Sequence, residues 1–314
     1  MPLQANDSAL LDSVRLIRWP ARKKSPAGMA GNHLSRVLGV SAEFTEYRAY
    51  RPGDAIQRID WKLLARSNRA YIRLSNDWTV QSTLLLVDAS GSLAYPAATL
   101  EKWHFARQLA LGLAAAAHRG NDPVGLLVAT DAGPRRLPPR GRRGVVGDIA
   151  RVLSTIVPEG SQQLAPLMRF VPLLRSTGRI AIISDFLGDA EAMRAMAGQL
   201  SAAGREVHAV HVVHANELDP QRRTTLLTDP EDVHFKRPMT AATRRSYLAT
   251  FTAWREQLAR EWRMAGTYYT MVSTSEPVAY AVRRVAMPIV SGGNVRDAPG
   301  PSVGRAGGRG GPVS

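Results

Sequence analysis

The chain of 314 residues contains no cysteine. This absence excludes disulfide bonds, zinc knuckles, iron–sulfur ligation and cysteine nucleophiles, and it suits a reducing compartment. Long apolar runs are also missing, because the most apolar windows, residues 83–87 and 180–183, are far shorter than the ~20 residues that cross a bilayer. The N-terminal residues do not follow a signal-peptide pattern. We therefore expect a soluble, cytoplasmic protein.

Acidic residues are scarce compared with basic ones. The chain has 41 Lys and Arg against 26 Asp and Glu, a formal net charge of +15. Such an excess points to an anionic partner, whether nucleic acid, a membrane surface or an acidic protein. Common catalytic signatures are absent too, since neither a P-loop, a G-x-G-x-x-G turn nor a G-x-S-x-G elbow occurs. We expect no enzymatic activity.

Apolar strand-like segments alternate with segments of helical periodicity from about residue 83 onward. The predicted strands cover residues 83–88, 123–130, 179–185, 207–213 and 267–272. The predicted helices cover residues 97–119, 145–157, 163–175, 189–203, 240–265 and 276–286. This alternation predicts an α/β fold with a mainly parallel sheet and helices on both faces. Ligands of such sheets bind at the carboxyl ends of the strands.

Three regions differ in composition. Residues 1–82 lack long helical periodicity and are predicted to form a smaller, β-containing N-terminal region. Residues 83–290 form the predicted α/β domain. Residues 291–314 contain eight glycines and almost nothing to bury, so we expect a disordered Gly/Arg/Pro tail.

Side chains with oxygen donors follow the first strand of the predicted sheet. Asp88 ends that strand, and Ser90 and Ser92 come two and four residues later, so their side chains can converge in a tight turn. Asp185 ends another strand, and Ser161 could add a further hydroxyl. Such a set suits a hard divalent cation, with Mg²⁺ the best fit and Mn²⁺ or Ca²⁺ as alternatives. The competing interpretation is that the strand-end acid simply caps the next helix.

The pattern Asp88-x-Ser90-x-Ser92 resembles the metal-ion-dependent adhesion site (MIDAS) of the von Willebrand factor A fold. That family follows its D-x-S-x-S motif with a threonine and then an aspartate. Asp185 matches the last position, and Ser161 stands where the family has threonine. The resemblance implies a metal site at which a partner's acidic residue completes the coordination of the ion.

A second resemblance covers roughly residues 30–288. The chain is similar to the bacterial domain-of-unknown-function family 58 (DUF58), whose members carry a von Willebrand A-like domain after an N-terminal motif. That motif begins here with Gly31-Asn32-His33-Leu34-Ser35. Its most specific run extends from Glu43 to Arg66 and includes Tyr50-Arg51-Pro52-Gly53-Asp54 and Arg58-Ile59-Asp60-Trp61. The resemblance implies an adaptor or co-chaperone of a MoxR-type AAA+ ATPase.

Two basic segments allow more than one interpretation. The arginines of the N-terminal motif form either a partner surface or, the interpretation we favour, an internal network with Trp61 in the core. A turn-rich loop over residues 135–143 carries Arg135, Arg136, Arg140, Arg142 and Arg143. It could dock on an acidic protein, bind phosphates or be plain solvated surface.

The sequence therefore predicts a non-enzymatic protein-interaction module with a Mg²⁺-type site. The alternative is a basic protein that binds nucleic acid or an anionic surface, although a MoxR-type ATPase or another protein is the partner we expect.

Overall fold

A computed structural model describes residues 5–21, 29–35, 44–51, 59–75, 77–130, 133–160, 170–188, 190–220, 226–228, 236–238 and 240–287. The tail predicted over residues 291–314 lies outside the described residues, as does Ser161.

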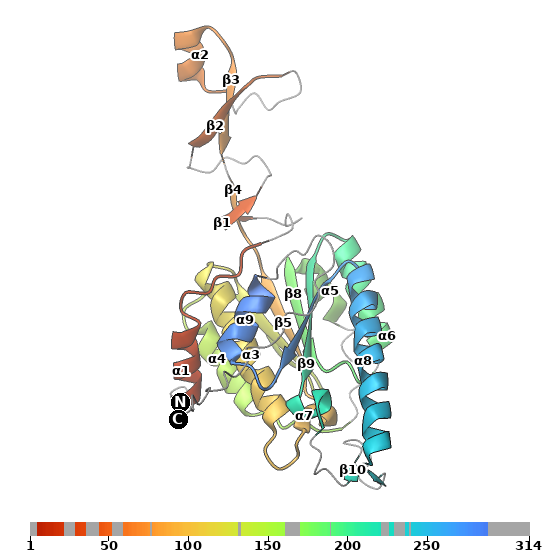
Figure 1. Ribbon diagram of the computed structural model, residues 1–314. Helices are drawn as coiled ribbons and strands as arrows, with labels where there is room; N and C mark the ends of the chain where they lie inside the picture. Colours follow the sequence, from red (N-terminus) through yellow and green to blue (C-terminus); the bar gives the residue numbers. More distant parts are fainter. Residues whose placement is uncertain are drawn as a thin grey trace, which may run out of the picture.

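A six-stranded sheet forms the centre of the molecule (Figure 1). Its order is β12 (Tyr268–Ser273), β9 (Glu206–Val213), β8 (Arg179–Ser184), β5 (Thr83–Asp88), β6 (Val124–Ala129) and β7 (Arg135–Arg140). The first five strands are parallel, and only β7 runs antiparallel to its neighbour β6. Apolar side chains fill β5, β6 and β8 because both faces of the sheet are covered.

Helices cover the two faces as separate layers (Figure 1). One layer contains α1 (Ala5–Ser13), α3 (Glu101–Arg119), α4 (Val145–Ser154) and α9 (Val278–Ala286). The other contains α5 (Val171–Ser176), α6 (Ala190–Ala202) and α8 (Ala241–Met264). Successive residues of a strand point to opposite faces, so Leu85 and Val87 pack with the first layer and Leu84 and Leu86 with the second. This arrangement confirms the predicted mainly parallel α/β fold.

The shorter elements lie outside this sandwich. β1 (Met29–Ser35) pairs with β4 (Asp77–Val80), and β2 (Phe44–Ala49) pairs with β3 (Tyr71–Ser75), both antiparallel. Together with α2 (Trp61–Ser67), these strands extend away from the sheet (Figure 1). The 3₁₀ turn η2 (Gly91–Ala94), α7 (Ala215–Leu218) and the pair β10 (Leu226–Thr228) and β11 (Lys236–Pro238) complete the described elements.

The first helix packs on the sheet domain rather than beside the strand pairs β1–β4 and β2–β3. Leu10, Val14 and Trp19 are buried in the same core cluster as α3 and α9. Asp7 pairs with Arg107 of α3 at 3.2 Å. The domain boundaries drawn at residues 82/83 and 290/291 stay predictions, but residues 5–21 contribute directly to the core of the α/β domain.

Two expectations from the sequence are wrong. Residues 135–140, expected in a loop, form the edge strand β7, since the backbone of this segment pairs with β6 despite its two prolines. Trp61, expected in a core, is 57% exposed, and no other residue of its helix α2 is buried either. None of the helices in the described parts of the chain combines the length and apolarity that a membrane span requires.

Candidate metal centre

Asp88 is the last residue of β5, in the middle of the sheet, and it is held in place by two neutral donors. Its Oδ1 accepts a hydrogen bond from the Ser90 backbone N–H at 2.9 Å. Its Oδ2 accepts one from the Ser184 hydroxyl at 2.7 Å, at the end of neighbouring β8. Both bonds leave each carboxylate oxygen with a further lone pair, so Asp88 retains capacity to bind a cation.

The turn after Asp88 brings the two predicted serines together. Ser90 Oγ and Ser92 Oγ lie 3.0 Å apart, in hydrogen-bond contact, and both residues are buried. The turn is packed closely against residues 159–160, because the Gly91 N–H donates to the Gly160 carbonyl at 2.8 Å. A Cβ at Gly91 would lie 3.3 Å from that carbonyl oxygen, so glycine suits this approach. The structure therefore brings Asp88, Ser90 and Ser92 together as predicted, while the role of Ser161 stays a prediction.

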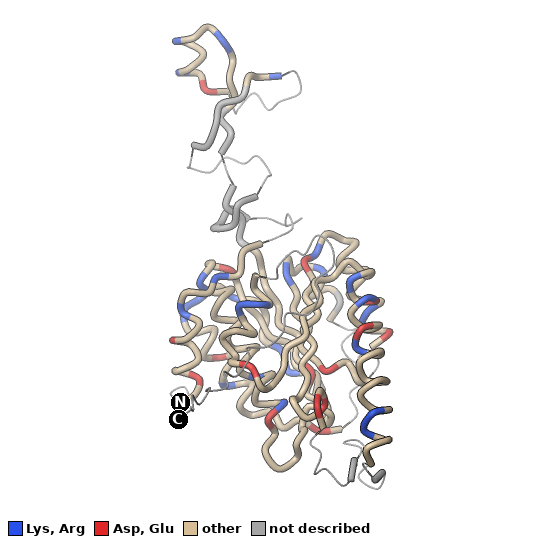
Figure 2. The backbone as a smooth tube through the Cα atoms, viewed as in Figure 1, with Lys and Arg blue, Asp and Glu red and all other residues tan. Residues whose placement is uncertain are grey.

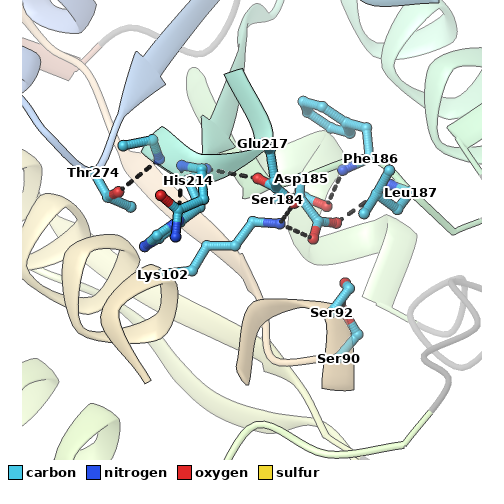
Figure 3. Close-up of polar contacts among 12 residues, drawn as sticks. Ser90, Ser92, Lys102, Ser184, Asp185, Phe186, Leu187, His214, Glu217 and Thr274 are labelled. Atoms are coloured by element: carbon cyan, nitrogen blue, oxygen red, sulfur yellow. Dashed lines mark hydrogen bonds and ion pairs between the residues drawn. The ribbon is translucent and has the colours of Figure 1, made fainter. Parts of the chain in front are cut away.

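Asp185 lies beside the same strand end but already faces a cation. Its Oδ2 is 2.8 Å from the Lys102 ammonium, and its Oδ1 accepts from the Leu187 N–H at 3.2 Å. The Lys102 ammonium also lies 2.8 Å from Glu217 Oε1. Figure 3 shows it between the two carboxylates, with Ser90 and Ser92 on a neighbouring turn. Asp185 therefore contributes negative charge near the site, but a large part of that charge is neutralised.

Glu217 and His214 connect this cluster to the start of α7. Glu217 Oε2 accepts from the His214 backbone N–H at 2.6 Å, and the His214 side chain accepts from the Asn216 N–H, which together form a capping box. His214 Nε2 lies 3.0 Å from Glu101 Oε2 of α3. The cluster thus spans the carboxyl ends of β5, β8 and β9 and the first turn of α3.

The surroundings of Asp88 and Lys102 raise the pKa values of both side chains. Burial, together with the charge of Asp185, raises the pKa of Asp88. Burial alone would lower the pKa of Lys102, but the carboxylates of Asp185 and Glu217 outweigh it and raise that pKa. Lys102 is therefore a permanent cation at neutral pH, and Asp88 is a carboxylate whose ionised form a bound cation would stabilise.

The donor set fits a small hard cation. Within the described residues no group of three or more His, Asp or Glu side chains forms a metal-binding cluster. The candidate site relies instead on one carboxylate and two hydroxyls, from Asp88, Ser90 and Ser92. Oxygen-only donors of this type match Mg²⁺ or Mn²⁺ and leave positions for water or a partner's carboxylate.

Sequence reasoning missed Lys102, Glu217 and Ser184. The signal for Lys102 was available, because this lysine shares the buried face of α3 with Ala106 and Leu109. A charged residue on an apolar helix face requires a buried counter-charge. Ser184 directly precedes Asp185, but its bond to Asp88 depends on strand pairing that the sequence does not specify.

The predicted partner-binding arginines lie away from this centre, on β7 and the turn that follows it. Arg135, Arg136, Arg140, Arg142 and Arg143 are all exposed. Arg142 pairs with Asp148, and the Arg136 guanidinium lies 5.6 Å from the centre of the Phe170 ring. Intramolecular contacts therefore already engage part of this basic segment, and its partner-binding role stays a prediction.

The strand order, with an Asp-x-Ser-x-Ser turn at the end of a central strand, defines a von Willebrand A-like α/β protein. The chain belongs to the DUF58 family, described as proteins of unknown function, whose family model matches residues 46–257. Uncharacterized proteins Mb1516 of Mycobacterium bovis and Rv1480 of Mycobacterium tuberculosis are each 30% identical to it over 235 residues. The match covers 72% of this chain and 72% of each relative.

Solved structures with a similar arrangement include the conserved hypothetical protein BatB from Bacteroides thetaiotaomicron. It is 18% identical, with a TM-score of 0.41, and the match covers 65% of this chain and 96% of BatB. Proximal thread matrix protein 1 from the mussel byssus, solved with a zinc-occupied MIDAS motif, is 14% identical. Its TM-score is 0.38, and the match covers 66% of this chain and 47% of that protein.

Proposed function

We propose that this chain is a protein-interaction module that holds a divalent cation, Mg²⁺ or Mn²⁺, and uses it to bind an acidic residue of a partner. The observation that carries the proposal is the convergence of Asp88 with the Ser90 and Ser92 hydroxyls at the carboxyl end of β5. Neutral hydroxyls leave the ion's charge largely uncompensated, so a carboxylate from another protein is a favourable further ligand. Asp88, Ser90 and Ser92 would hold the ion, and Asp185 would act on it through its remaining charge or a water molecule.

We infer further that the partner is a MoxR-type AAA+ ATPase, for which this chain acts as a cytoplasmic adaptor without catalytic activity. The resemblance of residues 43–66 to the DUF58 motif supports this partner. The non-enzymatic role is proposed because the candidate ligands suit ion binding, and because neither a P-loop nor a G-x-S-x-G elbow occurs in the sequence.

The experiment is capture of the purified MoxR-type ATPase from the same genome by the full chain, in Mg²⁺ without nucleotide. We expect the D88A variant to lose at least about tenfold in affinity, equivalent to ~1.4 kcal/mol. D12A is the matched control, because Asp12 is an exposed aspartate on α1. If D88A captures the ATPase as well as D12A does, the ion-dependent function is wrong.

A further inference from the structure

Lys102 is a charged side chain in a place that solvent does not reach. Its exposed fraction is 0%, and its ammonium lies 2.8 Å from both Asp185 Oδ2 and Glu217 Oε1 (Figure 3). A buried ammonium is unfavourable unless carboxylates and hydrogen bonds compensate it. The fold keeps this lysine beside the candidate metal centre, although an apolar residue would fit the buried face of α3 more easily.

The two strand-end aspartates are consequently unequal. Asp185 bonds Lys102 through one oxygen and the Leu187 N–H through the other. Within the described part of the chain, Asp88 accepts from neutral donors, the Ser90 N–H and the Ser184 hydroxyl. A cation beside Asp88 and the serines would therefore meet one carboxylate whose charge is not already matched by an ammonium.

We propose that Lys102 is a specificity-determining residue of this site: a built-in cation that weakens divalent-ion binding and leaves a bound ion with excess positive charge. Affinity of oxygen-ligand sites rises with the number of ligand charges, and Lys102 removes charge by neutralising Asp185. Repulsion between the ammonium and the ion acts in the same direction, and it is strong where water is excluded. The site is thereby tuned to favour a further carboxylate from the partner.

This inference rests on the proposed function, since it concerns an ion held by Asp88, Ser90 and Ser92. It goes further by assigning the preference for an acidic ligand to a residue that does not contact the ion. Thermodynamic reciprocity then requires that a partner carboxylate strengthen ion binding by the same factor by which the ion strengthens partner binding.

The test is Mn²⁺ binding by isothermal titration calorimetry, with the full-length wild-type chain and the K102M and K102R variants. K102M should bind Mn²⁺ at least about tenfold more tightly than wild type, because it frees Asp185 and removes a repelling charge. K102R keeps the positive charge and should stay within about threefold of wild type. K62M, at an exposed lysine of α2, is the matched control and should leave the affinity unchanged.

Folding of each variant is checked by circular dichroism before titration. If K102M alone does not fold, K102M/E217Q replaces it, because this pair removes one carboxylate together with the ammonium and leaves Asp185 free. It too should bind Mn²⁺ more tightly than wild type. Unchanged or weaker binding by the folded variant would overturn the proposed role of Lys102.

The D88A variant separates this inference from the proposed function. If wild type binds Mn²⁺, D88A does not, and K102M equals wild type, the ion site stands and the role of Lys102 is wrong. A second outcome is that K102M binds Mn²⁺ and wild type does not, and that adding D88A to K102M abolishes the binding. Lys102 then has the inferred role, but the wild-type chain does not work as an ion-dependent module. If neither binds, both proposals fail.

Discussion

Arg179 carries a second buried charge, at the amino end of β8 and opposite the candidate metal centre. Its guanidinium lies 3.2 Å from Glu206 and 3.3 Å from Asp122, and all three side chains are 0% exposed. The Trp19 ring lies 4.6 Å from the guanidinium carbon. Two carboxylates around one arginine make the network sensitive to loss of the cation, since each would remain buried without it.

Replacing this arginine should destabilise the fold strongly. R179M removes the guanidinium that pairs with both Asp122 and Glu206, so we expect the free energy of unfolding to fall by about 3–5 kcal/mol, measured by urea denaturation. R260M is the control, because Arg260 and Glu256 are exposed and their closest atoms are 3.9 Å apart. It should change stability by less than about 0.5 kcal/mol, and equal losses in the two variants would contradict the account.

His211 gives stability a specific pH dependence. Burial lowers its pKa to about 3; Asp185 opposes this shift, whereas Lys102 and Arg255 add to it. Because the pKa of an unfolded histidine is about 6.5, the unfolded chain takes up a proton as the pH falls below that value and the folded chain does not. The contribution of His211 to folding stability is therefore complete above pH 7 and is lost as the pH falls toward 3.

Between pH 7 and pH 5 this effect should lower the free energy of unfolding by about 2 kcal/mol. In H211Q, which keeps a side chain able to bond the Tyr269 hydroxyl, that part of the pH dependence should disappear. Urea titrations of both proteins at the two pH values measure the difference. A variant with the same pH dependence as wild type would show that His211 is not the group responsible.

At the level of elements, α3 depends on close contact with α9. A Cβ on Gly112 would lie 2.5 Å from Val282 Cγ2, so any side chain there forces the stiff valine to move. We expect G112A to lower the free energy of unfolding by about 1–3 kcal/mol, despite the higher helix propensity of alanine. V282A in the same chain should restore part of the loss.

Gly147 of α4 is the matched control for this prediction. It is also a helical glycine, but a Cβ added there would meet no atom within 4 Å from other elements of the described chain, so G147A points into open space. That variant should gain about 0.5–1 kcal/mol from helix propensity alone. Thermal and urea denaturation measure the change in the free energy of unfolding in both variants. A higher free energy of unfolding in G112A would contradict the close contact between Gly112 and Val282.

Most elements of the α/β domain follow from the sequence because their apolar periodicity is continuous. The strand predicted at residues 83–88 coincides with β5, and α6 and α8 differ from their predicted bounds by one residue at each end. The edge strand β7 is missed because Pro138 and Pro139 and its arginines resemble a turn. Its strand structure comes from pairing with β6, which is a tertiary effect.

The candidate site can be predicted from the sequence only where its residues are close together along the chain. Asp88, Ser90 and Ser92 lie within five residues, so local geometry brings them together. Lys102, Asp185 and Glu217 come from three separate elements, and only the folded sheet places their charges within bonding distance. The sequence motif therefore indicates the ligands but not the cation that faces one of them.

At the scale of the whole molecule, two tryptophans of the N-terminal 82 residues lie in opposite environments. Trp19 is 0% exposed, against Arg179 and His208 of the sheet domain, whereas Trp61 is 57% exposed on α2. W19A should lower the free energy of unfolding by about 3–5 kcal/mol, as expected for a buried aromatic residue. W61A should change it by less than about 1 kcal/mol. Similar effects in urea denaturation would contradict the packing of residues 5–21 on the core.

The net charge of +15 is distributed over several surfaces rather than gathered at the candidate site. Figure 2 shows Lys and Arg residues along α8 and at the distant end around α2. At the candidate site, the Lys102 ammonium lies against the Asp185 and Glu217 carboxylates and offsets part of their charge. A basic chain whose bound ion also keeps positive charge is suited to meet an acidic protein.

Calorimetric titration of Mg²⁺ or Mn²⁺ into the wild-type chain and into D88A tests the central claim most directly. The account predicts saturable binding of one ion per wild-type chain and no measurable binding to D88A, with both proteins folded by circular dichroism. Absence of binding to the wild-type chain, or equal binding to D88A, would contradict it.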